Sequence, residues 1–158
     1  MYHYVESGLD NIFLENGFIP HSTPYGDGMS IQDSAGLHRA IGIWLITMPK
    51  PLNGAELRFL RTEMETTQRD LAACLGTTEQ TLRLWEKNRK KNMPGSADRL
   101  LRVVYKEYTG GDGHVKRMLD RLAELNQLSH ARGSFRNTRN KWKDDSSAAR
   151  NVEECVGT

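Results

Sequence analysis

Residues 66–88 (TTQRDLAACLGTTEQTLRLWEKN) carry the feature that most constrains the fold, two short helical patterns with one glycine between them. Apolar residues recur three and four positions apart on both sides of Gly76, which places them on one face of each segment. They are Leu71, Ala72 and Leu75 before the glycine, and Leu82 and Trp85 after it. The spacing predicts short helices over 68–75 and 79–88, joined by a tight turn.

A threonine stands at the start of each predicted helix. Thr67 and Thr78 can each accept a hydrogen bond from a backbone N–H of the first turn, as N-cap side chains do. Two short helices joined in this way form the frame of a helix-turn-helix, in which the second helix presents its N-terminal residues to DNA base edges. There, Gln80 could pair with adenine, Glu79 could accept from cytosine, and Arg83 could contact guanine or phosphate.

The second helix leads into a basic run, RLWEKNRKK at 83–91, in which five of nine residues are cationic. Such a run is often only a solvated helix end. Directly after a helix in the major groove, however, it lies where the chain leaves the duplex and can contact phosphates. The full set of predicted DNA-binding residues is Thr67, Gln68, Thr78, Glu79, Gln80, Thr81, Arg83, Lys87, Arg89, Lys90 and Lys91.

These residues resemble the Cro/repressor-type helix-turn-helix, known as the XRE family, over roughly 54–105. The shared pattern is a Gln that opens the first short helix, Leu-Ala and Leu-Gly on its inner face, a Thr-led second helix and an aromatic-Glu pair near its end. The resemblance implies that Gln68 contacts phosphate. It also implies that Glu79 and Gln80 occupy base-contacting positions.

The resemblance bears on four further positions. It implies a partly buried ion pair between Arg61 and Glu86, which ties the preceding helix to the second short helix. Asn88 stands where the family often has Gly, and Asn tolerates the left-handed conformation of such a turn. Leu84 stands where some relatives carry a polar base-contacting residue, so it either touches a thymine methyl or faces the interior.

Turn signals dominate the first part of the chain. Asn16-Gly17 between two short apolar runs predicts a hairpin, because a type I′ turn needs positive φ at both central positions. A second turn at 23–28 and a strand at 29–32 follow. The pattern predicts a three-stranded meander.

A helix is predicted to complete this small α+β domain, residues 1–47. Asp33 or Ser34 can cap it, and residues 48–54 (MPKPLNG), with two prolines and a glycine, are predicted to be a linker. The apolar face of the helix comprises Leu37, Ala40, Ile41, Trp44 and Leu45.

The rest of the chain is predicted to be helical up to residue 128. Residues 55–108 form the helix-turn-helix domain, 112–128 an amphipathic helix, and 129–158 a polar, mobile tail without apolar periodicity. The fold class is therefore mainly α, a lambda-repressor-like helical bundle preceded by the small α+β domain. Other residues expected in its helices are Leu57, Leu60 and Met64 in a first helix at 55–65, and Leu100, Leu101 and Val104 in one capped by Ser96.

Charge changes sign along the chain. Residues 1–53 hold two Lys/Arg and five Asp/Glu, a balance of −3, whereas residues 54–108 hold eleven and eight, a balance of +3. Residues 109–158 hold nine and seven, a balance of +2. The asymmetry indicates at least two functional segments.

Several classes of protein are disfavoured. Two cysteines, of which Cys74 is expected to be a small buried hydrophobe, cannot form a four-cysteine zinc site, and no two of the five histidines have metal-ligand spacing. No catalytic constellation is present, so neither an enzyme nor a cofactor is expected. The longest apolar stretch, residues 40–46, is too short to span a bilayer and no leader pattern follows Met1, which indicates a bacterial cytoplasmic, nucleoid-associated protein.

These patterns favour a sequence-specific transcriptional regulator, a dimeric repressor that binds an inverted repeat of double-stranded DNA through the helix at 78–88. A homodimer is expected because one recognition helix contacts only about four to six base pairs. A third possibility keeps the fold but makes it a scaffold for an acidic protein.

The layout of the chain also resembles that of MqsA-type antitoxins, in which a β-rich N-terminal segment precedes a helix-turn-helix. Those proteins hold that segment with two Cys-x-x-Cys pairs around zinc, and residues 1–53 here contain no cysteine, so no zinc role is carried over. The resemblance implies an alternative function. Residues 1–53 would bind a toxin or other protein partner while the helix-turn-helix represses the operon.

Overall fold

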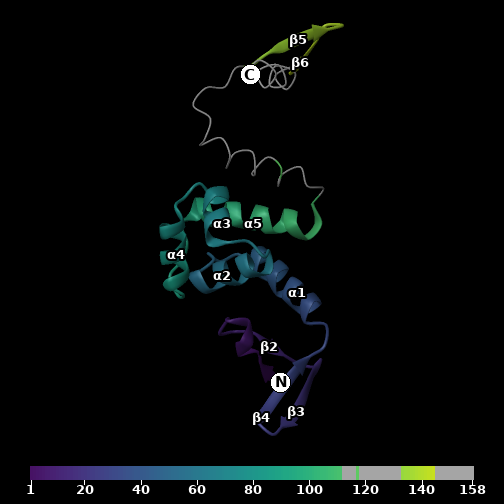
Figure 1. Cartoon of the computed structure of the whole chain (residues 1–158), viewed down its shortest axis with the longest axis vertical. Coiled ribbons are helices and arrows are strands. Elements are labelled where there is room, and N and C mark those ends of the chain that lie inside the picture. Colours follow the sequence, from purple (N-terminus) through teal and green to yellow (C-terminus); the bar gives the residue numbers. More distant parts are fainter. Residues whose placement is uncertain (112–116, 118–132, 145–158) are drawn as a thin grey trace, which may run out of the picture. The chain divides into compact units, whose positions relative to one another are not determined.

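The structure is a computed structural model that describes residues 1–111, 117 and 133–144. The chain divides into two compact units, residues 1–123 and 124–158. The described part is mixed, with five α-helices and three two-stranded antiparallel sheets, which agrees at this coarse level with a helical bundle preceded by β structure. The helices are α1 (Ser34–Thr47), α2 (Gly54–Glu63), α3 (Gln68–Leu75), α4 (Glu79–Lys87) and α5 (Gly95–Gly110), all in the first unit (Figure 1).

Leucines from all five helices fill one core. Helix α2 packs against α1 and α4, and α5 packs against α1 and α3. The fully buried side chains are Leu45, Leu52, Leu57, Leu60, Leu71, Leu82, Leu101 and Tyr105. Where one helix contributes two of them, they lie three or four residues apart, so that helix turns one apolar face inward.

Helix α1 begins at the predicted cap but buries a narrower face than predicted. The Asp33 carboxylate accepts a hydrogen bond from the N–H of Gly36 at 3.1 Å. Ile41 and Leu45 are buried, whereas Ala40 and Trp44, predicted to face inward, are exposed. Ile41 and Leu45, four residues apart, lie on the side of α1 that packs against α2 and α5. Ala40 and Trp44 lie next to that side, where solvent reaches them.

Helices α1 and α5 approach each other closely at Gly42. A Cβ atom at this position would collide with the Tyr105 hydroxyl group. This hydroxyl is buried and has no hydrogen-bond partner among the described residues. Burial, with a smaller contribution from the nearby Glu63 carboxylate, raises the pKa of Tyr105 to about 12.

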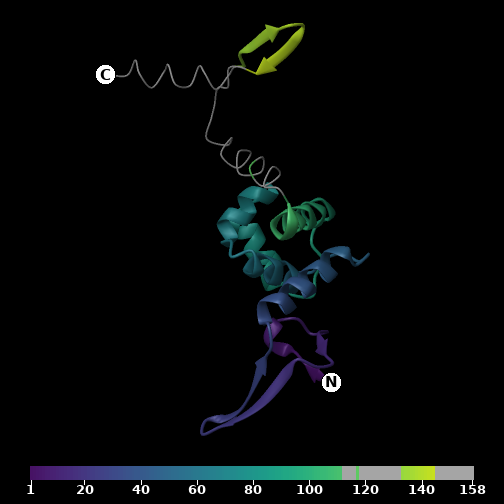
Figure 2. The ribbon, with the colours of Figure 1, turned by 90° about the vertical axis from the view of Figure 1, so that its right-hand side faces the viewer.

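The N-terminal strands do not form the predicted meander. Strand β1 (Tyr2–His3) pairs with β2 (Phe13–Leu14), and β3 (Phe18–Thr23) pairs with β4 (Gly26–Ile31), in two separate antiparallel sheets. A short 3-10 helix, η1 (Val5–Ser7), follows β1. The β3–β4 hairpin extends away from the helices in Figure 2, and its residues 19–28 are exposed.

The predicted Asn16-Gly17 hairpin is wrong because its two flanking strands belong to different sheets. Only Gly17 has positive φ (77°), and its carbonyl accepts from the N–H of Gln32, which extends the β3–β4 ladder. Strand β2 pairs with β1 instead, and in this arrangement Ile12 and Leu14 are buried. The other side chains buried in this segment are Tyr4 and Leu9.

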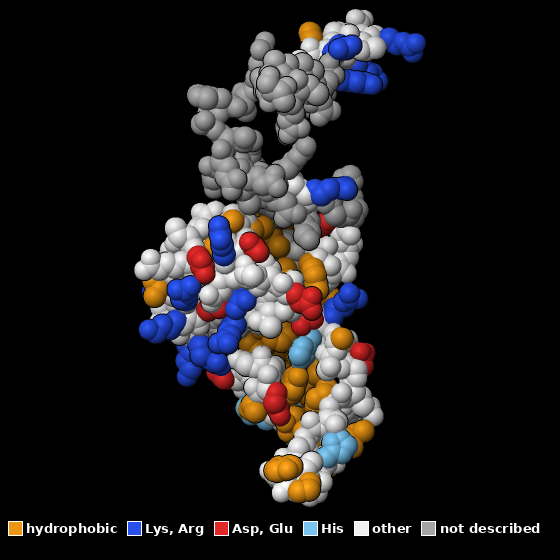
Figure 3. All heavy atoms as spheres, viewed as in Figure 1, with side chains coloured by type: hydrophobic (Ala, Val, Ile, Leu, Met, Phe, Trp, Pro, Cys, Tyr) orange, Lys and Arg blue, Asp and Glu red, His pale blue; other side chains and the backbone are white. Residues whose placement is uncertain are grey.

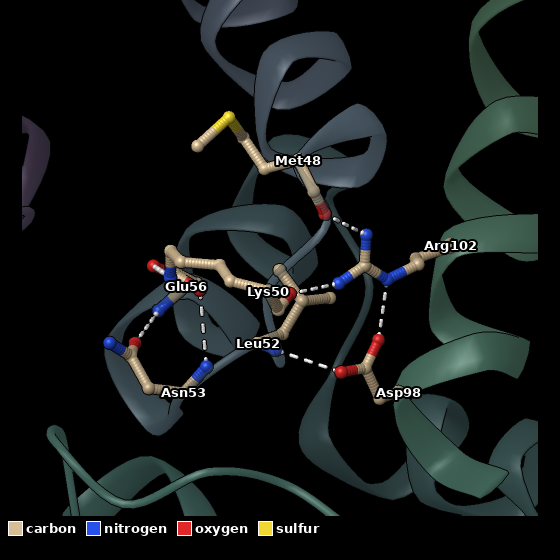
Figure 4. Close-up of polar contacts among 7 residues, drawn as sticks. All are labelled: Met48, Lys50, Leu52, Asn53, Glu56, Asp98 and Arg102. Carbon is tan, nitrogen blue, oxygen red and sulfur yellow. Dashed lines mark hydrogen bonds and ion pairs between the residues drawn. The ribbon is translucent and has the colours of Figure 1, made fainter. Parts of the chain in front are cut away.

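The predicted linker at 48–54 is anchored to α5 by one arginine (Figure 4). The Arg102 guanidinium donates through Nε to Asp98 Oδ1 at 2.5 Å, one turn earlier on the same helix. Its remaining bonds go to backbone carbonyls at 2.5–2.9 Å, those of Ile46, Met48 and Lys50. One side chain thereby fixes the backbone between the end of α1 and Lys50.

The end of this segment is fixed just as firmly. Leu52 is fully buried, and its N–H donates to Asp98 Oδ2 at 2.8 Å. Asn53 and Glu56 then form a reciprocal capping box at the start of α2. Glu56 is itself buried and pairs with Lys50 Nζ at 2.5 Å, so its charge is compensated.

Helix α5 does not use its predicted cap. It begins at Gly95 after Pro94, and no side chain accepts from its first turn, so Ser96 lies inside the helix rather than before it. The buried residues are Ala97, Asp98, Leu101 and Tyr105, whereas the predicted Leu100 and Val104 are half-buried. The inward face is therefore turned by one position from the predicted one.

In the second unit the structure contains a hairpin where a tail without structure was predicted. Strand β5 (Phe135–Thr138) pairs with β6 (Lys141–Asp144). Arg139 and Asn140, between the strands, both have positive φ (53° and 60°), which suits the twist of a tight hairpin. The prediction failed because it looked for apolar periodicity, and these strands are mostly polar.

The predicted helix at 112–128 and the remaining tail at 129–132 and 145–158 lie outside the described residues, apart from the helical Arg117. In the part of the chain that is described, no helix is both long and apolar enough to cross a membrane.

Candidate nucleic-acid interface

The first short helix has the predicted bounds, and its ends are set by local chemistry. Thr67 Oγ1 accepts from the N–H of Asp70 at 3.1 Å, which caps α3. At the other end Gly76 adopts the left-handed conformation (φ 72°), and the N–H of Thr77 returns to the carbonyl of Ala72 at 2.9 Å. A Cβ at Gly76 would meet nothing within 4 Å, so the backbone conformation, and not space, favours glycine there.

The second short helix, α4, is capped in the same way. Thr78 Oγ1 accepts from the N–H of Thr81 at 3.2 Å, and the two hydroxyl groups lie 2.8 Å apart. Leu82 faces the core, and Trp85 is half-buried against it. The opposite face is exposed to solvent and comprises Glu79, Gln80, Arg83, Leu84 and Lys87.

The outward orientation of Leu84 excludes one of the two alternatives left by the sequence, and contact with a thymine methyl stays a prediction. Its side chain is 51% exposed, so it does not face the interior. It lies on the same face of α4 as Gln80, one turn away. A thymine methyl group is the DNA feature that suits such a side chain.

A chain of polar contacts runs from the core to the exposed face of α4. Arg61 donates to both oxygens of the buried Glu86, through Nε at 2.5 Å and Nη2 at 3.2 Å. Gln68 Nε2 donates to the same carboxylate at 2.8 Å, and Arg83 Nε lies 3.5 Å from Gln68 Oε1. Arg83 in turn pairs with Glu79 at 3.0 Å.

This chain bears on the predicted role of Gln68. The side chain is half-buried, and its amide nitrogen donates to Glu86, so its orientation is set within the protein itself. Glu79, predicted to contact a base, and Arg83, predicted to contact guanine or phosphate, form an ion pair on the exposed surface. That pair is exposed and one helical turn apart, so separating it costs little.

The backbone of the basic run is tied to the start of α2. The N–H of Gly54 donates to the carbonyl of Lys91 at 3.2 Å, and that of Ala55 to the carbonyl of Arg89 at 3.1 Å. Gly54 also lies so close to the carbonyls of Trp85 and Asn88 that a Cβ would collide with them. The run is therefore a fixed segment and not a frayed helix end.

Asn88, which ends α4, does not adopt the left-handed conformation expected of it. Its φ is −84° and its ψ is 67°. The reason is tertiary, because the carbonyls that follow it cap α2 and impose a different path on the chain.

Three of the predicted phosphate contacts are exposed lysines on this fixed segment. Lys87, Lys90 and Lys91 have no ion-pair partner among the described residues. Lys and Arg side chains gather over the α4 side of the molecule in Figure 3. Their backbone attachment and exposed heads suit contact with a polyanion.

Arg89, also a predicted phosphate contact, points toward the N-terminal segment instead. Its Nη2 donates to the carbonyl of Gly8 at 2.7 Å and lies 3.5 Å from Asp10 Oδ1. The side chain remains half exposed. Through these contacts the acidic N-terminal segment touches the basic run. No sequence signal predicts this, because the residues lie about eighty positions apart in the chain.

The same N-terminal segment, α1 and α2 line an open pocket of about 430 Å³ beside Arg89. On its wall, His38 Nε2 lies 2.8 Å from the Tyr4 hydroxyl, and its Nδ1 lies 3.4 Å from Glu63. Burial, with the nearby acidic Glu6 and Glu63, raises the pKa of Tyr4. The pocket carries both acidic and basic side chains and defines no single ligand.

Cys74 lies at the edge of this helix pair. It is half-buried rather than buried as predicted, because Leu71, Ala72 and Leu75 form the inward face of α3 and Cys74 lies at the margin of that face. Within residues 1–111, 117 and 133–144, no three His, Cys, Asp or Glu side chains lie together as a metal site requires.

Comparison of this chain with protein-family models, with curated proteins and with solved structures found no match.

Proposed function

We propose that this protein is a sequence-specific DNA-binding transcriptional regulator, a dimeric repressor that recognises an inverted repeat through α4. The observation that carries the proposal is the geometry of α3 and α4. They are two capped helices around a left-handed glycine, and the second exposes Glu79, Gln80, Arg83 and Lys87 on one face. A helix of this kind places its N-terminal residues against base edges in the major groove.

The helical part of the first unit, α1 to α5, then corresponds to the lambda-repressor-like bundle that the sequence predicts. The exposed lysines of the basic run supply affinity without sequence preference, and α4 supplies the preference. The proposal includes a homodimer in the bacterial cytoplasm, on the nucleoid. Catalysis and a cofactor form no part of this proposal.

The proposal is tested by fluorescence anisotropy of the purified full chain on duplex DNA. One probe is the sequence upstream of its own gene, and the other is a scrambled duplex of equal length, each measured over a salt series. We expect the upstream duplex to bind about 10³-fold more tightly or better, with a steep salt dependence. Equal and weak binding to both probes would refute sequence-specific regulation.

An antitoxin-type function is the second candidate, and the exposed N-terminal hairpin favours it. Residues 1–53 carry a balance of −3, and Tyr25 at the tip of the β3–β4 hairpin is fully exposed. The negative balance of residues 1–53 as a whole suits a basic protein partner, and Tyr25 offers that partner an exposed aromatic side chain. The test is co-purification of the full chain with the product of the neighbouring gene, and loss of that complex on Tyr25→Ser. If the complex forms equally well with Tyr25→Ser, the tip of the hairpin does not bind the partner.

A further inference from the structure

The two strands of the β3–β4 hairpin each have one outer edge, because no third described strand joins this sheet. The ladder continues from the bond between the N–H of Gln32 and the carbonyl of Gly17, at 2.8 Å. Bonded and non-bonded pairs alternate along an antiparallel ladder, so every second residue turns its N–H and carbonyl outward. On β4 these outward residues are Asp27, Met29 and Ile31.

The outer edge of β3 is protected against further pairing, whereas that of β4 is not. The outward residues of β3 are Phe18, Pro20 and Ser22. Pro20, the middle one, has no backbone N–H, so it cannot donate to another strand. Edge strands of native sheets are commonly protected in this way by proline, or by lysine. Strand β4 contains neither residue type, and its edge can accept a further strand.

The hairpin also lacks a core of its own. Residues 19–28 are exposed, and the hairpin extends away from the helices in Figure 2. Two strands on their own are marginal in water, and three or more strands with an apolar face are more stable. Met29 and Pro20 lie opposite each other on the same face as Phe18 and Ile31. A further strand along β4 extends this apolar face.

We propose that the outer edge of β4 binds β4 of a second copy of this chain, so that two hairpins form one four-stranded antiparallel sheet. The two β3 strands then lie at the ends of the sheet, and Pro20 protects both ends. Growth therefore stops at two copies, as a two-fold symmetric dimer requires. The proposal rests on the dimer of the proposed function and names the contact that forms it.

A two-fold axis at Met29 fits this pairing best. All three outward residues of β4 are then used, because Met29 lies opposite its own copy and Asp27 lies opposite Ile31 of the other copy. Like charges directly opposite each other destabilise a strand pair, and this register keeps the two Asp27 carboxylates apart. The two Met29 side chains meet on the face that also carries Pro20.

Other occupants fit this edge less well. Residues 1–38 contain no Lys or Arg, so the hairpin has no cation for a nucleic-acid phosphate. A strand of a basic protein would find one carboxylate, Asp27, among the outward residues of β4. Pairing with a second copy also accounts for the protection of one edge and not the other.

The test measures the dissociation constant of the dimer by sedimentation equilibrium of the full chain without DNA. Met29→Pro removes an outward N–H from β4 and leaves the bonds between β3 and β4 in place. The matched control is Ser22→Pro, which removes an outward N–H from the edge of β3 instead.

We expect Met29→Pro to weaken the dimer about 10- to 100-fold, because the two-fold axis removes the same backbone hydrogen bond twice. Ser22→Pro should leave the dissociation constant unchanged. A wild-type chain that is monomeric, or an equal effect of the two substitutions, would overturn the proposal.

A pair of charged substitutions keeps the test decisive whatever proline does to the hairpin. Met29→Asp and Met29→Lys each place like charges opposite each other, so each homodimer should weaken about threefold or more. An equimolar mixture of the two variants should dimerise more tightly than either alone, because opposite charges then face each other. A mixture no tighter than the single variants would rule out the axis at Met29 and with it the proposal.

A different occupant and a failure of the proposed function give different results. If the wild-type chain is monomeric and Met29→Pro abolishes co-purification with the product of the neighbouring gene, β4 binds a strand of that protein and the proposal is wrong. The proposed function fails when the wild-type chain shows no preference for the upstream duplex. A dimer that depends on Met29 supports the strand pairing in either case.

Discussion

Two networks of arginine hydrogen bonds lie in the helical part of the molecule, and they differ in where their contacts lead. Around Arg102, every contact leads inward, to a carboxylate and to three backbone carbonyls of one chain segment. Arg61 donates to one backbone carbonyl, that of Thr66, and its other contacts lead outward, from the buried Glu86 through Gln68 to Arg83 on the exposed face of α4. The first network is made mostly with backbone carbonyls and the second mostly with side chains.

The difference shows which cations are available to a ligand. A guanidinium whose donors are occupied by backbone carbonyls anchors the fold and cannot leave without loss of stability. A guanidinium in an exposed pair can exchange its partner at small cost. Charge in the sequence therefore indicates a binding surface only where tertiary contacts leave it free.

The largest effect is expected at the inward network. Arg102→Ala leaves the buried Asp98 without its ion-pair partner and removes three side-chain bonds to the segment between α1 and α2. We expect the free energy of unfolding to fall by about 3–5 kcal/mol, measured by urea denaturation. Arg99→Ala, exposed on the same helix, should change it by less than about 0.5 kcal/mol. Equal small losses at both positions would contradict an anchoring role.

Glu86→Gln tests the buried end of the outward network. The change keeps the shape but removes the charge that Arg61 and Gln68 share. We expect a loss of about 2–3 kcal/mol in the free energy of unfolding, because bonds to charged groups are worth about 1.5–3 kcal/mol. Glu79→Gln, at the exposed end, is the control and should have almost no effect on stability. A large fall in the free energy of unfolding of Glu79→Gln would contradict the expectation that the exposed end of the network contributes little to stability.

Gln80→Ala tests the exposed face of α4 as a recognition surface. The residue is exposed, so stability should be unchanged. Binding to the upstream duplex should weaken by about 1–3 kcal/mol, with little change on a scrambled duplex, in anisotropy titrations. If both duplexes are affected alike, Gln80 contacts no base.

Tyr105→Phe tests the buried Tyr105 hydroxyl group, which forms a hydrogen bond with neither network. Its hydroxyl has no partner among the described residues, so removing it should raise the free energy of unfolding by about 1 kcal/mol near neutral pH. The pKa of Tyr105 is raised from 10.0 to about 12, so the unfolded chain ionises first and stability falls as pH rises through this interval. The variant should lose that part of the pH dependence in alkaline urea titrations. A lower stability for the variant would show that the hydroxyl is satisfied.

Lys90→Ala should have the smallest effect. Its side chain is exposed on the fixed basic run, where a phosphate contact is predicted. We expect all duplexes to bind slightly more weakly and the salt slope to become shallower by about 1. A selective loss on the upstream duplex would assign Lys90 to base recognition and weaken the division between α4 and the basic run.

Local signals predicted the best-defined part of the candidate site. Thr67, Gly76 and Thr78 act through hydrogen bonds or dihedral angles within a few residues, so the bounds of α3 follow from sequence alone. The spacing of Asp98 and Arg102, one helical turn apart, was also visible but did not reveal what else Arg102 holds. Its carbonyl partners lie more than fifty residues away in sequence.

Non-local pairing defeated the prediction elsewhere. Asn16-Gly17 has a strong turn signal, yet its strands pair with other strands because burial of Leu14 draws β2 to β1. Arg89 was expected to face phosphate, but the N-terminal segment supplies it with the carbonyl of Gly8. The contacts of the predicted DNA-binding residues with DNA remain predictions.

The sequence by itself determined where the short helices begin and end, which face of each is apolar, and where positive charge gathers. These properties depend on neighbours one to four residues apart, which the chain carries in its order. Only the tertiary structure decided which cations are engaged and which remain free, and which strands pair. Both depend on surfaces brought together from distant positions, and burial in the shared core selects among the partners that local chemistry allows.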